Sequence, residues 1–196
     1  MRQAQVLSEK DKQRILAYVS KNSFAARNRA MLMLSWLAGM RVGEIAALTF
    51  SDVVNVTGEI RAQIQLSAEQ TKGNEARTVY VGSQLQQELR NYINTYNSVP
   101  DAASPFIPSK TNKHFSANGL CLRFIRLYKA AGVDKATSHS GRRTFITNLA
   151  NKGVNVRVLA ALAGHKHIAT TQRYIDLNEE VLKAAIELAL GCGTDS

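Results

Sequence analysis

The chain is organised around residues 137–176, which read Thr-Ser-His-Ser-Gly-Arg-Arg-Thr-Phe, then an apolar helical segment, then Leu-Ala-Gly-His-Lys-His-Ile-Ala-Thr-Thr-Gln-Arg-Tyr-Ile-Asp. This stretch holds two imidazoles, a fixed positive charge and a phenol: His139, His165, Arg142 and Tyr174. A guanidinium binds phosphate oxygens through two donors, and imidazoles move protons near neutral pH. A tyrosine hydroxyl becomes a nucleophile when its negative charge is stabilised. The chemistry that these groups share is attack on a phosphodiester.

The spacing of these groups is His139-x-x-Arg142, then Gly164-His165, then Tyr174 nine residues later. This pattern resembles the signature of the tyrosine recombinases, also called phage-type integrases. Two upstream motifs extend the resemblance, namely Gly39-Met40-Arg41-Val42-Gly43-Glu44-Ile45 and Thr71-Lys72-Gly73 ahead of Arg77-Thr78-Val79. They resemble the family's first arginine motif and its hairpin lysine. The matches run from about Leu7 to about Asp176, and six positions in the right order make them specific.

The resemblance implies a reaction on DNA. Tyr174 would attack a phosphodiester and form a 3′-phosphotyrosyl bond, which frees a 5′-hydroxyl. Arg41, Arg142 and His165 would hold the non-bridging oxygens and offset the charge of the transition state. Lys72 would enter the minor groove and act as the general acid for the leaving 5′ oxygen.

Two further roles follow from the same resemblance. His139 would manage the proton of the nucleophile, and Glu44 would support the site from behind Arg41. Without the resemblance, Arg41 and Glu44 would read as a surface ion pair of little energy, and Lys72 as an exposed turn lysine. A charge at the end of a buried helix nevertheless favours a functional interpretation of Arg41.

Length and composition limit the kinds of protein and of binding partner that are compatible with this sequence. The chain has 196 residues, 45% of them hydrophobic, which is enough for one globular domain with a sizeable core. Lys and Arg total 25 against 15 Asp and Glu, a formal charge of +10. Such an excess favours polyanions, of which nucleic acid is the commonest. The basic residues are scattered over many segments, which argues against a membrane surface, and no apolar run is long enough to span a bilayer.

The patterning predicts an α+β fold, a mostly helical domain with a small three-stranded antiparallel sheet, as in tyrosine recombinase catalytic domains. Strands are expected at 53–56, 59–66 and 77–81, where residues alternate or are β-branched. Helices are expected at about 9–19, 25–38, 83–96, 116–131, 156–163, 170–174 and 179–190, with a short one ending at Leu48. Another should begin at Thr137 or Ser138, so that His139 and Arg142 share one face near a positive N-terminus that suits a phosphate.

Four more basic residues are candidate DNA contacts: Arg143, Lys113, Arg123 and Arg126. Arg123 and Arg126 lie three residues apart on one face of a predicted helix, for which a solvated face is the ordinary interpretation. Lys113 lies in a loop at 97–115 that either covers DNA or is a solvated connector. Arg143 is expected to point away from Arg142, as a backbone contact or a surface charge.

No metal and no other cofactor are expected. His165-Lys166-His167 suggests a metal site at first sight, but no carboxylate or thiolate clusters with it and a cationic pocket repels a divalent ion. The partner implied is double-stranded DNA, bound by a homo-tetramer on paired recombination sites, with weak self-association without DNA and no membrane. The two distant cysteines, Cys121 and Cys192, fit a reduced protein, and a cytoplasmic, nucleoid-associated location follows.

The expected organisation is a single catalytic domain over 1–196, without the separate N-terminal core-binding domain of most members of the family. Two alternatives stay open: a catalytic domain excised from a longer protein, and a short one-domain member of the family. Residues 178–196 are expected to form a C-terminal helix and tail, which packs on its own core or docks in a neighbouring subunit.

Three other functions stay open: a type IB topoisomerase, a catalytically silent DNA-binding regulator, and a metal-dependent nuclease. The nine-residue spacing and small size favour a recombinase over a topoisomerase, and the complete set of six residues argues against a silent regulator. The target sequence and the direction of recombination lie in base contacts that no motif reveals.

Overall fold

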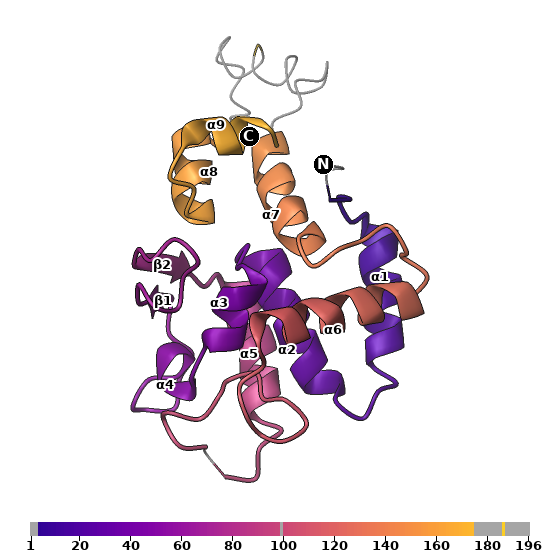
Figure 1. The fold of residues 1–196 in the computed structure, drawn as a ribbon, viewed down its shortest axis with the longest axis vertical. Coiled ribbons are helices and arrows are strands. Elements are labelled where there is room, and N and C mark those ends of the chain that lie inside the picture. Colours follow the sequence, from indigo (N-terminus) through magenta and orange to yellow (C-terminus); the bar gives the residue numbers. More distant parts are fainter. Residues whose placement is uncertain (1–3, 99, 175–185, 187–196) are drawn as a thin grey trace, which may run out of the picture. The chain divides into compact units, whose positions relative to one another are not determined.

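The structure, a computed structural model, describes residues 4–98, 100–174 and 186. The chain forms two compact units, Met1–Phe145 and Ile146–Ser196. The described part is mostly helical with one small antiparallel sheet, so the predicted α+β class is confirmed (Figure 1). The predicted C-terminal helix and tail at 178–196 lie outside the described residues except for Ile186.

The first unit opens with two helices that sequence patterns predicted. Helix α1 spans Glu9–Val19 and begins at a capping box, in which Ser8 Oγ accepts from the Asp11 backbone and the Asp11 carboxylate accepts from the Ser8 backbone. Helix α2 spans Ala25–Leu37 and is buried along most of its length, which confirms its predicted central place. It packs against α1 and against α5, Ser83–Ile93.

The sheet has two strands in the described residues, where three were predicted. Strand β1, Gln63–Leu66, pairs antiparallel with β2, Arg77–Tyr80, with Ile64 opposite Val79. The expected strand at 53–56 does not form. Val53 ends the short helix α4, Phe50–Val53, which starts at a capping box of Thr49 and Asp52, and the chain turns at Val56 and Thr57. What remains of that strand is a single antiparallel bridge between Val54 and Ile60.

The core of the first unit is completed by segments that come before and after the sheet in the sequence. Helix α3, Val42–Ala47, packs against α2 and against α6, Ala117–Ala130, which also lies against α1 (Figure 1). The segment predicted as a loop at 97–115 contributes to this core. Its Phe106 is fully buried, with ring centroids 5.2 Å from Phe50 and 5.4 Å from Tyr92.

Three more helices follow. Helix α7 spans Ser140–Asn151 and starts later than predicted, and the division between the two units falls within it. In the second unit, α8, Val156–Ala163, packs against α9, Ile168–Gln172. None of the helices in the described ranges has both the length and the apolar character needed to cross a membrane.

Candidate active site

Arg41 lies at a chain reversal between two helices. Helix α2 ends at Leu37, Gly39 adopts a left-handed backbone with φ of 60°, and Arg41 is the residue that precedes α3. Glycine tolerates this conformation because it has no Cβ. The reversal therefore delivers a half-buried arginine from the end of a buried helix, at the place where the sequence predicted a functional charge.

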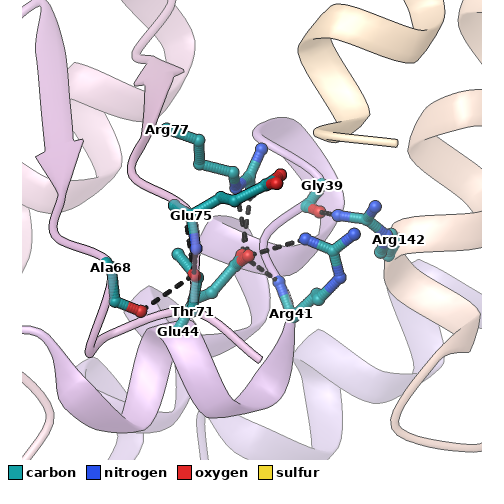
Figure 2. Close-up of polar contacts among 8 residues, drawn as sticks. All are labelled: Gly39, Arg41, Glu44, Ala68, Thr71, Glu75, Arg77 and Arg142. Atoms are coloured by element: carbon teal, nitrogen blue, oxygen red, sulfur yellow. Dashed lines mark hydrogen bonds and ion pairs between the residues drawn. The ribbon is translucent and has the colours of Figure 1, made fainter. Parts of the chain in front are cut away.

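Glu44 lies behind Arg41 and is almost completely buried, with a side chain 1% exposed. Its carboxylate accepts from the Arg41 backbone N–H at 2.7 Å and from Arg41 Nη1 at 2.8 Å. Arg77 of β2 donates to the same carboxylate from the other side (Figure 2). The pair of Arg41 and Glu44 thus belongs to a partly buried network centred on a buried carboxylate, and is not the surface ion pair that the sequence left open.

Arg142 is held against the same reversal. Its Nη1 donates to the Gly39 carbonyl at 2.6 Å, and the residue is 6% exposed (Figure 2). The start of α7 can approach because Gly141 has no side chain: a Cβ there would lie 2.4 Å from the ring of Trp36. Residues far apart in sequence are thereby joined, and both arginines are positioned by the short segment Gly39–Glu44 of the first unit.

His139 lies outside the helix in which it was predicted. Helix α7 begins at Ser140, and the His139 carbonyl accepts the first helical bond, from the Arg143 N–H at 2.9 Å. The Ser140 hydroxyl accepts from the Thr137 backbone at 2.9 Å, which holds residues 137–139 in a turn ahead of the helix. His139 is consequently exposed while Arg142 is buried, so the two do not share a helical face as expected.

The charge around His139 makes its imidazole a poor proton acceptor in the free protein. Although His139 is exposed at the surface, partial loss of water around its imidazole lowers its pKa below the usual 6.5, and the positive charges of Arg142, Lys72 and Arg41 lower it further. The imidazole is therefore neutral at pH 7. A neutral imidazole in a cationic site can accept a proton once a phosphate offsets the surrounding charge.

Lys72 lies in the loop between β1 and β2 and is exposed. The loop is closed by the Thr71 hydroxyl, which donates to the Glu75 carbonyl at 2.8 Å or to the Ala68 carbonyl at 3.0 Å, and accepts from the Glu75 N–H at 3.1 Å (Figure 2). Such side-chain bonds hold a short loop in one shape. The lysine is thus carried on a defined loop.

A cavity of about 460 Å³ connects these groups. Its lining includes Arg41 from the start of α3, Lys72 from the hairpin loop, and His139 from the turn before α7. The structure therefore brings three of the sequence-predicted residues around one hollow of the first unit, with Arg142 bonded two residues before Arg41. The lining holds two cations, Arg41 and Lys72, with the imidazole of His139, and of its two carboxylates Glu44 is paired with Arg41 and Arg77. Cations that reach one hollow from separate segments suit an anion such as a phosphodiester.

His165 and Tyr174 lie in the second unit and contact each other. Gly164 ends α8 in a left-handed conformation with φ of 61°, and the His165 N–H returns to the Ala160 carbonyl at 2.9 Å. The imidazole Nδ1 lies 2.9 Å from Thr171 Oγ1 of α9. The rings of His165 and Tyr174 stack, with centroids 5.8 Å apart and planes at 21°. His167, by contrast, is exposed.

The remaining candidate DNA contacts are placed differently from one another. Lys113 and Arg126 are exposed. Arg123 is half-buried and its Nε donates to Asn28 Oδ1 at 3.4 Å, and Arg143 is half-buried on α7. Within the described ranges, no group of three or more His, Cys, Asp or Glu side chains is arranged to hold a metal ion.

The sequence analysis missed Arg77 and Cys121 as parts of this site. The sequence assigns Arg77 to a strand and to the motif around the hairpin lysine, but to no role in the site, although a buried glutamate requires charged, hydrogen-bonding partners. Cys121 of α6 lines the cavity and its thiol donates to Ser138 Oγ at 3.0 Å. No sequence signal marked it, since its neighbours in the site come from other segments.

Comparison with known proteins places the chain in a family. Residues 5–181 match the sequence model of the phage integrase family. The chain belongs to that family. Among its relatives, this integrase-family chain is 28% identical to the tyrosine recombinase XerA of Pyrococcus furiosus over 185 residues, 93% of this chain and 61% of the relative. It is 30% identical to the tyrosine recombinase XerD of Halalkalibacterium halodurans, over 79% of this chain and 50% of the relative. The chain thus spans half to three fifths of the length of these relatives.

Solved structures give the same fold for this phage integrase family chain. The crystal structure of XerA recombinase superposes with a TM-score of 0.75 at 25% identity, over 98% of this chain and 67% of that one. The integrase of the Tn1549 transposon, in complex with transposon right end DNA, superposes with a TM-score of 0.72 at 19% identity, over 97% and 67%. At that lower identity the likeness concerns the fold alone.

Proposed function

We propose that this chain is the catalytic domain, over 1–196, of a site-specific DNA recombinase. It cleaves and rejoins strands through a 3′-phosphotyrosyl intermediate. The observation that carries the proposal is the positioning of Arg41 and Arg142 by the segment Gly39–Glu44, beside a cavity lined by Lys72 and His139. Membership of the phage integrase family supports the same reaction.

In the proposed first step, the Tyr174 phenol oxygen attacks the phosphorus of a DNA phosphodiester. The bond from phosphorus to the 5′ oxygen breaks, and a tyrosine–phosphorus bond forms. The phenol proton passes to His139, and Lys72 gives a proton to the leaving 5′ oxygen. Arg41, Arg142 and His165 stabilise the charge on the non-bridging oxygens.

The second step reverses the first with a different strand. The 5′-hydroxyl of that strand attacks the phosphotyrosyl phosphorus and gives its proton to the neutral Lys72. The bond from phosphorus to the tyrosine oxygen breaks, and His139 returns the proton to Tyr174. The number of phosphodiester bonds is unchanged, so this reaction consumes no high-energy cofactor. The contact of His165 Nδ1 with Thr171 orients the imidazole that stacks on Tyr174, which suits a residue that must meet the same phosphate.

The proposed partner is double-stranded DNA, at paired recombination sites bound by a homo-tetramer that associates weakly without DNA. Lys113 and Arg126 are exposed and suited to contact the DNA backbone, and Arg123 and Arg143 are proposed as further contacts. The tail at 178–196 is proposed to dock in a neighbouring subunit. Action on DNA implies a cytoplasmic, nucleoid-associated location as part of the same proposal.

Covalent trapping tests the proposal. The full chain is incubated, with a chelator present, with nicked duplexes made from the DNA that flanks its own gene. A protein–DNA adduct that survives boiling in detergent is expected from the wild type. It should be absent from Tyr174→Phe and retained by Tyr80→Phe, which removes the hydroxyl of an exposed tyrosine on strand β2.

Three results would count against this proposal. An adduct that persists in Tyr174→Phe would overturn the choice of nucleophile. Binding to DNA at low salt with no adduct from the wild type would favour a silent DNA-binding regulator instead. Relaxation of supercoiled DNA in proportion to monomer concentration, with no strand exchange, would favour a topoisomerase.

A further inference from the structure

One buried carboxylate lies among the cations of the first unit. Glu44 receives bonds from two guanidinium groups that come from different elements, Arg41 at the start of α3 and Arg77 at the start of β2 (Figure 2). A charge this deeply buried is tolerated only when it is paired and hydrogen-bonded. The two pairings differ, and the difference assigns a role to Arg77.

Arg77 grips both carboxylate oxygens with the planar edge of its guanidinium. Its Nε donates to Glu44 Oε1 at 3.0 Å and its Nη2 donates to Oε2 at 2.8 Å. This two-point geometry is the strongest that a guanidinium and a carboxylate make. The side chain of Arg77 is itself only 10% exposed, so the pair is shielded from water.

Arg41 grips Glu44 differently. Its side chain reaches Oε1 through Nη1 at 2.8 Å, while Oε2 is reached by its backbone N–H at 2.7 Å. The Arg41 side chain is 31% exposed and lines the cavity. Glu44 therefore orients Arg41, but the negative charge of Glu44 is neutralised by the two-point contact with the guanidinium of Arg77.

The ionisation of Glu44 agrees with that division. Burial by itself would raise the pKa of Glu44, but the bonds and charge of Arg77 foremost, and then those of Arg41, outweigh it and hold the pKa below its usual 4.5. Glu44 is therefore negative at neutral pH. Arg41, Arg77 and Glu44 together carry one net positive charge, and without Arg77 the remaining pair would carry none.

We propose that Arg77 is a positioning residue that neutralises Glu44, so that Arg41 presents its positive charge to the phosphodiester. The proposal rests on the proposed recombinase function of the same site. Arg77 also begins β2 directly after the loop that carries Lys72, and Thr71 closes that loop onto Glu75, two residues before Arg77. The same ion pair thus ties the lysine loop to the helix of Arg41.

A charge-compensation experiment tests the proposal with the trapping assay under single-turnover conditions. Arg77→Gln is expected to slow adduct formation by about tenfold to a hundredfold, as loss of charge stabilisation in a transition state does. DNA affinity at the same salt should change no more than in Arg90→Gln, which removes an exposed arginine of α5. Arg77→Lys keeps the positive charge but loses the two-point contact, so its rate of adduct formation should lie between those of the wild type and Arg77→Gln.

The deciding comparison is made in the Glu44→Gln background. With no carboxylate to neutralise, replacing Arg77 by Gln is expected to slow cleavage less than about threefold, against the tenfold or more expected with Glu44 present. An Arg77 that acted through contacts other than the one with Glu44 would cost at least as much in both backgrounds. The arm in the Glu44→Gln background can be measured even if Arg77→Gln alone proves too unstable to assay, because the double variant holds no buried carboxylate without its guanidinium partner.

The outcomes separate the two proposals. A loss of tenfold or more on changing Arg77 in the Glu44→Gln background would overturn the role of Arg77 while leaving the recombinase function intact. No adduct from the wild-type chain would instead remove the proposed function. The expected pattern, a large effect with Glu44 and a small one without it, supports both.

Discussion

Replacing Gly39 by alanine tests whether the chain reversal between α2 and α3 holds the arginines in place. Two costs can be worked from the structure. Gly39 has φ of 60°, where an alanine is strained by about 1–2 kcal/mol. A Cβ at Gly39 would also lie 2.5 Å from Phe145 Cδ1 and 2.9 Å from Cε1. Carbon atoms prefer separations of about 3.5–4.0 Å, so the ring must move by about 1 Å, at a cost of about 1–3 kcal/mol.

The two costs predict a measurable loss of stability. Their sum is about 2–5 kcal/mol, and the reduced freedom of the unfolded chain returns at most about 1 kcal/mol. Gly39→Ala should therefore lower the free energy of unfolding by about 1–4 kcal/mol, measured by urea denaturation followed by circular dichroism. Because the Gly39 carbonyl accepts from Arg142, the variant should also cleave DNA more slowly.

Matched variants isolate the clash from the strain. Gly58 has φ of 83° and nothing within 4 Å of a built Cβ, so Gly58→Ala carries the backbone strain alone. Gly39→Ala should be less stable than Gly58→Ala by about 1–3 kcal/mol. In a Phe145→Ala background that excess should disappear. Equal stability of the two glycine variants would show that Phe145 does not press on Gly39, and the account of the reversal would be wrong.

Two further predictions concern proton transfer. Lys72→Ala should slow cleavage of ordinary DNA by about 10²–10⁴-fold, the usual contribution of a general acid. It should slow cleavage of a substrate with a 5′-bridging sulfur far less, because a thiolate leaves without a proton. The control is Lys110→Ala, which removes another exposed loop lysine. An equal defect of Lys72→Ala on both substrates would contradict the role of Lys72 as the acid. Since burial and then Arg142, Lys72 and Arg41 depress the pKa of His139, Arg41→Gln should raise that pKa toward 6.5 in an NMR titration of the imidazole. An unchanged titration in Arg41→Gln would refute the electrostatic cause. Because the pKa of His139 is lower in the folded than in the unfolded chain, the contribution of neutral His139 to stability is present above pH 6.5 and is lost as pH falls through the folded pKa.

Helix prediction succeeded where local chemistry decides the structure. The boundaries of α1 follow from the capping box of Ser8 and Asp11, and the start of α6 follows from Ser116, whose hydroxyl accepts from the Gly119 N–H at 3.0 Å. Both signals act within one turn, so no distant contact is needed to interpret them. The end of α8 at Gly164 is readable for the same reason.

The first predicted strand and the solvated character of the loop at 97–115 were decided by contacts that local preference does not show. Val53, Val54 and Val56 favour a strand, but the Thr49–Asp52 capping box starts a helical turn first, and Val56 is left fully exposed. The segment around Phe106 looks like a connector because of its prolines. Its burial against Phe50 and Tyr92 depends on residues far away in the sequence.

The sequence by itself determined the helical character, the family and the six candidate catalytic residues, because caps, periodicity and motif spacing are local properties of the chain. Only the tertiary structure showed that Arg142 bonds to Gly39, that His139 lies outside α7, and that Arg77 shares Glu44 with Arg41. Each of these depends on packing between segments distant in sequence. A hydrogen bond across 103 residues leaves no periodic trace, and a buried charge acquires its partner only when the strand folds against the helix.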